Sequence, residues 1–148
     1  MGMHFTIDEL CRSTMAKAHG IDNTPPEWVA QNLRVTIAGC ERVRAFLNRG
    51  HSRAVAMLIS SGYRCEALNA LVGGVGGSQH PRGEAVDFTA PAFGAPKEIV
   101  AALYPELEIL GIDQLIYEGA WVHMSFTLYP RYQTLVFDSG AYKPYRPV

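Results

Sequence analysis

The sequence predicts an α+β fold in which N-terminal helices pack on one small, mainly antiparallel sheet. In the first third of the chain, apolar residues recur at intervals of three and four residues, which is typical of helices. From residue 54 onward, short apolar or alternating runs separated by glycine and proline indicate strands. Helices that come first and neighbouring antiparallel strands that follow are the arrangement of an α+β protein.

Two helices are predicted before residue 51. The first covers residues 7–20, with Thr6 as its N-cap and Gly20 at its end. The second covers residues 27–50 and begins after a turn that contains two prolines. Its regular spacing defines one apolar face, which consists of Val29, Leu33, Ile37, Cys40, Val43 and Leu47.

The rest of the chain is predicted to form the sheet and two shorter helices. The helices cover residues 66–74 and 96–107, and the strands cover residues 54–64, 84–90, 113–119, 121–126 and 132–140. We interpret 54–64 as a buried strand, and the residues after 140 as a proline-rich tail. Residues 113–126 are interpreted as a hairpin with Gly119–Ala120 as its loop. This register places Ile116 opposite His123 and Glu118 opposite Trp121.

The length and composition of the chain argue against several classes of protein. The chain has 148 residues, so one domain spanning residues 1–148 is expected. Its net charge of -1 argues against nucleic acid as the main partner. No apolar run approaches the roughly 20 residues of a membrane span, and the N-terminus does not resemble a signal peptide. The three cysteines are widely spaced, which argues against a disulfide framework and a cysteine zinc knuckle.

The stretch 76-GGSQHPRGEAVDF-88 contains the first candidate metal ligands, His80 and Asp87. In the predicted strand, Val86 and Phe88 alternate with Asp87, so the carboxylate points away from the apolar face. A carboxylate within a largely buried strand is costly unless it is paired or bound to a metal. An exposed aspartate on a solvent-facing strand is the alternative interpretation, and this stretch alone does not decide between the two.

His123 adds a third candidate. The predicted hairpin places it on a polar face together with Glu118, opposite an almost wholly apolar face. Taken alone, His123 is equally explained as a hydrogen-bonded strand histidine. With His80 and Asp87 it completes two imidazoles and a carboxylate, and three such ligands with one open water position are typical of catalytic zinc sites. Glu118 is then a candidate for proton transfer.

Three motifs support this hypothesis, namely 61-SGYR-64, 78-SQHPRGEAVD-87 and 121-WVH-123. The chain resembles the zinc peptidase family of D-Ala-D-Ala carboxypeptidases and L-alanyl-D-glutamate endopeptidases, especially its phage and prophage branch. The second motif matches the family's S-x-H-x-x-G-x-A-x-D at every fixed position. The N-terminal stretches 5-FTIDEL-10 and 22-DNTPPEWVAQNL-33 also look like this branch, so the resemblance covers nearly the whole chain. It implies the hedgehog/D-Ala-D-Ala peptidase-like fold.

The resemblance also implies roles for individual residues. The zinc ligands would be His80, Asp87 and His123. Glu118 would be the catalytic carboxylate, although it stands five residues before His123, whereas the family often has E-x-x-H. Arg64 would anchor the substrate or polarise its carbonyl. The remaining residues expected to bind substrate are Ser78, Gln79 and Trp121.

The implied reaction is hydrolysis of a peptide bond in the stem peptide of peptidoglycan, by attack of zinc-bound water on the carbonyl. We expect a monomer that is made in the cytoplasm. It would act on the cell wall after release, in the manner of an endolysin, or be carried in a phage particle. The sequence does not distinguish a carboxypeptidase from an endopeptidase.

Two other interpretations stay open at this point. The first is a phage or prophage structural or binding protein that keeps the zinc site without hydrolysis, because related domains can retain the fold and lose the reaction. The second is a cysteine hydrolase that uses Cys65 with a histidine, although no adjacent motif supports it.

Overall fold

The structure of the protein is a computed structural model that describes residues 3–74 and 76–147. The α-helices are α1 (Ile7–Cys11), α2 (Thr14–Ala18), α3 (Glu27–Leu47), α4 (Glu66–Leu71), α5 (Pro96–Leu103) and α6 (Leu107–Leu110). Two short 3-10 helices are η1 (His80–Arg82) and η2 (Tyr104–Glu106). The strands are β1 (Leu58–Ser61), β2 (Ala85–Thr89), β3 (Gln114–Tyr117), β4 (Val122–Ser125), β5 (Gln133–Asp138) and β6 (Ala141–Pro144).

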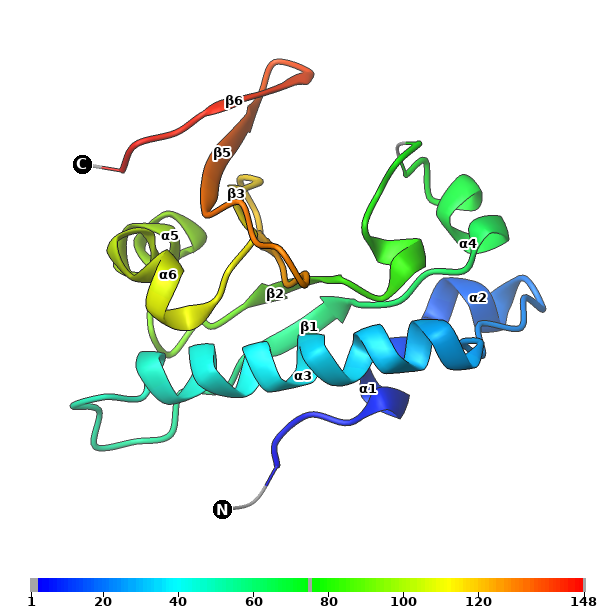
Figure 1. Ribbon diagram of the computed structural model, residues 1–148, viewed down its shortest axis with the longest axis horizontal. Coiled ribbons are helices and arrows are strands. Elements are labelled where there is room, and N and C mark those ends of the chain that lie inside the picture. Colours follow the sequence, from blue (N-terminus) through cyan, green and yellow to red (C-terminus); the bar gives the residue numbers. More distant parts are fainter. Residues whose placement is uncertain (1–2, 75, 148) are drawn as a thin grey trace.

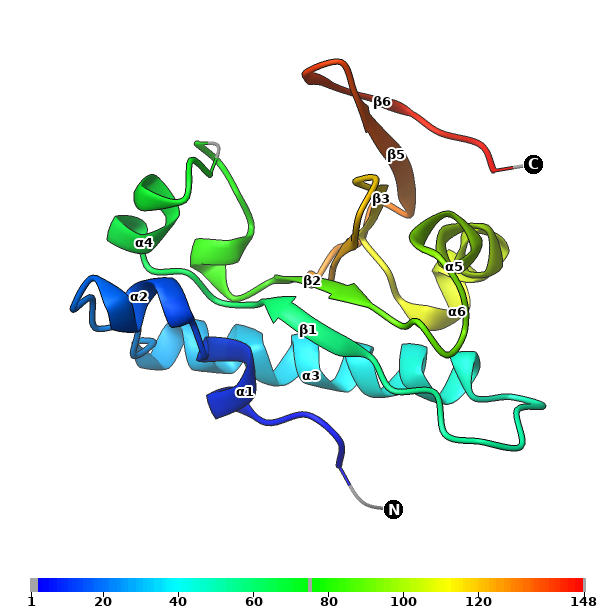
Figure 2. The same cartoon turned by 180° about the vertical axis from the view of Figure 1, so that it is seen from behind.

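The six strands form one sheet in the order β1-β2-β4-β3-β5-β6. Strands β3 and β5 pair in parallel, and the other four pairings are antiparallel. The predicted α+β class with a mainly antiparallel sheet is therefore confirmed. Figures 1 and 2 show that α3 runs along the sheet, while the β5–β6 hairpin projects away from that helix.

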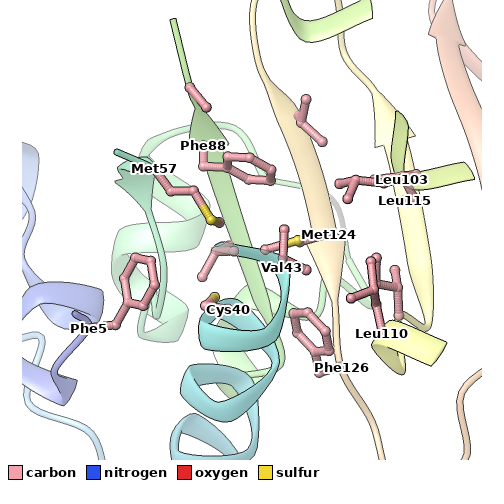
Figure 3. Packing of buried hydrophobic residues seen from close by; sticks show 14 of the residues in the cluster. Phe5, Cys40, Val43, Met57, Phe88, Leu103, Leu110, Leu115, Met124 and Phe126 are labelled. Carbon is pink, nitrogen blue, oxygen red and sulfur yellow. The ribbon is translucent and has the colours of Figure 1, made fainter. Parts of the chain in front are cut away.

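The hydrophobic core lies between α3 and one face of the sheet. All six residues of the predicted apolar face of α3 are buried. In Figure 3, Cys40 and Val43 of α3 lie close to Met124 of β4, and Phe88 of β2 lies beyond them. Apolar residues of β2 and β4 point into this core, so the residues between them, Asp87 and His123, point to the opposite face.

The predicted hairpin register is confirmed. Ile116 pairs with His123, and the amide of Glu118 donates to the carbonyl of Trp121 at 3.1 Å, which leaves Gly119 and Ala120 as the loop. Strand β2 lies on the other side of β4 and pairs Asp87 with His123. The pairing of β2 with β4 therefore places Asp87 next to His123, although the two residues are 36 positions apart in the sequence.

Four predicted elements differ from the structure. The helix expected at 7–20 is divided into α1 and α2, because the hydroxyl of Ser13 accepts a hydrogen bond from the amide of Ala16 and starts a new helix. The strand expected at 54–64 is not a buried strand. Only residues 58–61 pair, at the end of the sheet, and Leu58 is 53% exposed.

The other two corrections concern boundaries near prolines and glycines. The helix expected at 96–107 ends at Leu103, because Pro105 has no amide hydrogen to continue the helical ladder, and η2 and α6 follow. The tail after residue 140 contains a sixth strand. Ser139 and Gly140 both have positive φ, and this turn folds β6 back onto β5.

No helix within the described part of the chain is both long enough and apolar enough to cross a membrane.

Candidate metal centre

His80, Asp87 and His123 lie together on the face of the sheet opposite α3. Nε2 of His80 is 3.4 Å from Oδ2 of Asp87, and Nδ1 of His123 is 3.0 Å from Oδ1 of the same carboxylate. One ligand atom from each residue can be chosen so that all three lie within 4.8 Å of one another. All three residues are buried, and the side chains of Asp87 and His123 each keep about a tenth of their surface exposed.

The position of His80 depends on Gly62, at the end of β1. Nδ1 of His80 lies 2.6 Å from the carbonyl oxygen of Gly62. A carbonyl oxygen only accepts, so Nδ1 carries a proton, and Nε2 is the nitrogen that faces Asp87. A second backbone contact runs from the amide of Arg64 to the carbonyl of His80 at 3.3 Å. Residues 61–64 therefore fix the orientation of the imidazole.

Asp87 is ionised in this environment. Burial alone would raise the pKa of its carboxyl, but hydrogen bonds from His123 and His80 hold that pKa well below its usual range. An ionised carboxylate and an imidazole nitrogen with a free lone pair are the forms in which these side chains bind metals. The cluster could therefore hold a metal ion, with two histidines and one aspartate as its protein ligands.

Glu118 lies beside this cluster. Burial raises the pKa of its carboxyl, the nearby carboxylate of Asp87 acts in the same direction, and His123 partly offsets both. Oε2 of Glu118 accepts a hydrogen bond of 3.4 Å from the hydroxyl of Tyr142 on β6. Tyr142 is not among the predicted site residues, because the sequence predicts a proline-rich tail after residue 140. The one signal that could indicate a returning strand there is the turn at Ser139 and Gly140.

Arg64 approaches the cluster from the side of β1. Its Nε donates to Asn69 at 3.1 Å and its Nη1 donates to Ser61 at 3.2 Å, so the guanidinium is held in one orientation. Burial lowers the pKa of Arg64, and the charge of Asp87 opposes this effect. A pocket of about 380 Å³ adjoins Arg64 and Ser61, and its lining also includes Arg12 and Tyr63.

The three remaining predicted site residues lie at different places around the cluster. The hydroxyl of Ser78 accepts a hydrogen bond of 3.2 Å from the amide of His80, which supports the turn that carries this ligand. The side-chain amide of Gln79 donates to Asp113 at 3.0 Å, so it is directed at a neighbouring polar group. Trp121 is 39% exposed at the hairpin loop beside Glu118. Their roles towards a substrate stay predictions.

Asp113 is hydrogen-bonded to Gln79, the residue before the candidate ligand His80. It is fully buried and accepts hydrogen bonds from Gln79, from Ser125 at 2.9 Å, and from both the backbone and the guanidinium of Arg131. Burial would raise the pKa of this carboxyl, but these donors, with Arg131 foremost, lower it to about 2. The network ties the start of β3 to the turn before η1.

The Asp113 network predicts a pH-dependent stability. The pKa is about 2 in the folded protein, below the usual value, so the ionised carboxylate stabilises the fold. That contribution is present above about pH 4 and is lost as the pH falls towards 2. We expect the Asp113→Asn variant to be less stable than wild type at pH 5, with a difference that narrows towards pH 2. Urea denaturation of the metal-free protein measures it.

A matched control is Glu108→Gln, which neutralises an exposed carboxylate. Its difference from wild type should stay small across the same range. A difference between wild type and Asp113→Asn that is constant from pH 5 to pH 2 would contradict this assignment.

The fold places a buried group of three potential metal ligands on one face of an α+β sheet. A family model described as Peptidase M15 matches residues 3–125. The chain therefore belongs to the peptidase M15 family, and the family resemblance predicted from its motifs is confirmed. No curated protein matches the chain. The match ends at Ser125, so the β5–β6 hairpin lies beyond the matched residues.

Proposed function

We propose that this protein is a zinc peptidase that hydrolyses peptide bonds in the peptidoglycan stem peptide. The observation that carries the proposal is the buried cluster of His80, Asp87 and His123, with a half-buried glutamate and a half-buried arginine beside it. Membership of a peptidase family supports the reaction class. The stem peptide as substrate rests on the three sequence motifs.

His80, Asp87 and His123 would hold the zinc ion. Two imidazole nitrogens and one carboxylate oxygen are a common ligand set of catalytic zinc, which leaves one position for water or substrate. Zinc, when bound, lowers the pKa of a water molecule to about 7 and polarises a carbonyl. The carbonyl of Gly62 fixes the tautomer of His80, and such contacts increase the affinity of a site for its metal.

Glu118 would move the protons. It lies on the site face of the sheet, and burial raises the pKa of its carboxyl, which is the direction that favours proton transfer by a glutamate. It would accept a proton from the attacking water and donate it to the leaving amine. This assignment is supported by position in space, since Glu118 follows β3 directly and the carbonyl of Trp121 fixes its backbone.

Arg64 would bind the oxygen on which negative charge develops, or the carboxylate of the substrate. A guanidinium provides several N–H donors in a fixed plane, and Ser61 and Asn69 already orient it. The adjoining pocket offers room for the part of the peptide on that side. Trp121, Ser78 and Gln79 are proposed as further contacts around the peptide, with Trp121 at the exposed rim.

The test is digestion of purified peptidoglycan, followed by mass spectrometry of the products. We expect new peptide fragments with the zinc-loaded protein, and their loss with a chelator. Release of a terminal D-alanine would indicate a carboxypeptidase, and cleavage within the stem would indicate an endopeptidase. The Glu118→Gln variant should lose activity by about a hundredfold or more, because proton transfer typically contributes that much, while still binding zinc.

A protein that binds zinc tightly and leaves peptidoglycan intact would contradict the proposal and favour the structural or binding role instead. Inhibition by a thiol reagent with no effect of the chelator would favour a cysteine hydrolase.

A further inference from the structure

The β5–β6 hairpin brings one side chain to the candidate site from beyond the residues that match the peptidase family. Strand β5 pairs in parallel with β3, the strand that ends immediately before Glu118. Val136 of β5 is level with Tyr117 and with Lys143 of β6. One residue further along, Phe137 pairs with Tyr142, and this pair stands beside Glu118.

The alternation of side chains places this pair on the site face. Ile116 pairs with His123, so the two side chains lie on the same face of the sheet. Glu118 is two residues after Ile116 along the chain, so its side chain points to that face as well. Leu135 pairs with Ile116, which puts Phe137 on that side too. Glu118, Phe137 and His123 therefore lie on one face of the sheet, which is the face that carries the cluster.

The aromatic ring of Tyr142 is fixed by its partner. The rings of Phe137 and Tyr142 are 4.9 Å apart between centroids, at an angle of 56°. This is the offset, tilted contact that aromatic pairs favour. It orients the hydroxyl of Tyr142 towards Glu118, at 3.4 Å from Oε2. Burial and the charge of Glu118 raise the pKa of this hydroxyl, so it keeps its proton and can donate.

We propose that Tyr142 is a positioning residue for the reaction, which holds the carboxylate of Glu118 beside the metal cluster by a hydrogen bond to Oε2. The inference rests on the proposed role of Glu118. Among the described residues, Glu118 has this one side-chain hydrogen bond and a backbone hydrogen bond to Trp121, so loss of the hydroxyl leaves its carboxylate free to turn towards solvent. The hairpin then serves the site as well as the sheet, although it lies beyond Ser125.

A double-mutant cycle with Tyr142→Phe and Glu118→Ala tests this inference. The substrate is a synthetic stem pentapeptide, and all four proteins are loaded with zinc. We expect Tyr142→Phe to lower kcat about threefold to tenfold, the usual range for one lost hydrogen bond, with KM changed less than about twofold. In the Glu118→Ala background, the same change should leave the residual rate unaltered.

Two readouts do not depend on activity. The zinc affinity of Tyr142→Phe should equal that of wild type, because within the described part of the chain the hydroxyl of Tyr142 is hydrogen-bonded to Glu118 and to none of the three proposed ligands. The urea midpoints of the four proteins should be non-additive, since the two side chains share one contact. Tyr129→Phe is the matched control, because it removes a hydroxyl from a side chain that is 85% exposed, and it should change neither rate nor midpoint.

Equal losses of kcat in both backgrounds, or a rise in KM alone, would overturn the inference, and so would additive shifts of the urea midpoint. A wild-type protein without hydrolytic activity would overturn the proposed function, and the midpoints would still decide whether Tyr142 holds Glu118. The two failures are therefore distinguishable.

Discussion

Replacement of Asp87 by asparagine is expected to abolish peptidoglycan hydrolysis. The carboxylate of Asp87 lies between His80 and His123, at 3.4 Å and 3.0 Å from their nitrogens, and a neutral amide would bind zinc far more weakly. We expect a loss of at least about a thousandfold in activity, because a bound metal contributes several kcal/mol to the transition state. Metal analysis after dialysis should show the zinc content fall from one ion per chain to almost none.

Thermal unfolding provides an independent measurement of the same change. Zinc that binds the folded state alone raises the unfolding temperature, so the midpoint of wild type should increase with added zinc and that of Asp87→Asn should not. Asp8→Asn is the matched control, since Asp8 is exposed in the first turn of α1. Full zinc binding by Asp87→Asn would refute the assignment of this ligand.

Replacement of Gly62 by alanine is expected to damage both the fold and the site. A Cβ atom at this position would lie 2.3 Å from the carbonyl oxygen of Leu10, a backbone atom that also accepts a hydrogen bond of 2.7 Å from the amide of Tyr63. Something must move, and the carbonyl of Gly62 orients His80. We expect a loss of about 1–3 kcal/mol in the free energy of unfolding, and of about tenfold or more in zinc affinity.

Urea denaturation and a zinc titration measure the two effects. Gly76→Ala is the control, because a Cβ at Gly76 would meet no atom within 4 Å. If Gly62→Ala bound zinc as tightly as wild type, the backbone contact to His80 would not be important for the metal centre.

Much of the fold could be predicted from local pattern. The apolar face of α3 follows from spacing along one helix, and the register of the β3–β4 hairpin follows from a two-residue loop and alternating faces. The bounds of β1 and the existence of β6 are harder to predict from the sequence. The run before β1 is apolar because Val55 and Met57 are buried ahead of the strand, and β6 is exposed throughout, so it shows no alternation of polar and apolar residues.

The candidate site also contains residues that the sequence predicts and residues that it does not. His80, Asp87 and His123 could be grouped from motifs and strand alternation, since each residue type already indicates metal chemistry. Gly62 and Tyr142 could not be assigned these contacts from sequence, because they depend on neighbours that are distant along the chain. Leu10 is 52 residues before Gly62, and Glu118 is 24 residues before Tyr142.

The last strand also bears on how the molecules behave when they are concentrated. A strand at the end of a sheet exposes unpaired amides and carbonyls, and these invite a second molecule to add its own strand. Strand β6 carries Lys143 and Pro144. The charge of the lysine repels a like edge, and the proline has no amide hydrogen to offer. The sheet therefore ends in a strand that discourages aggregation between molecules.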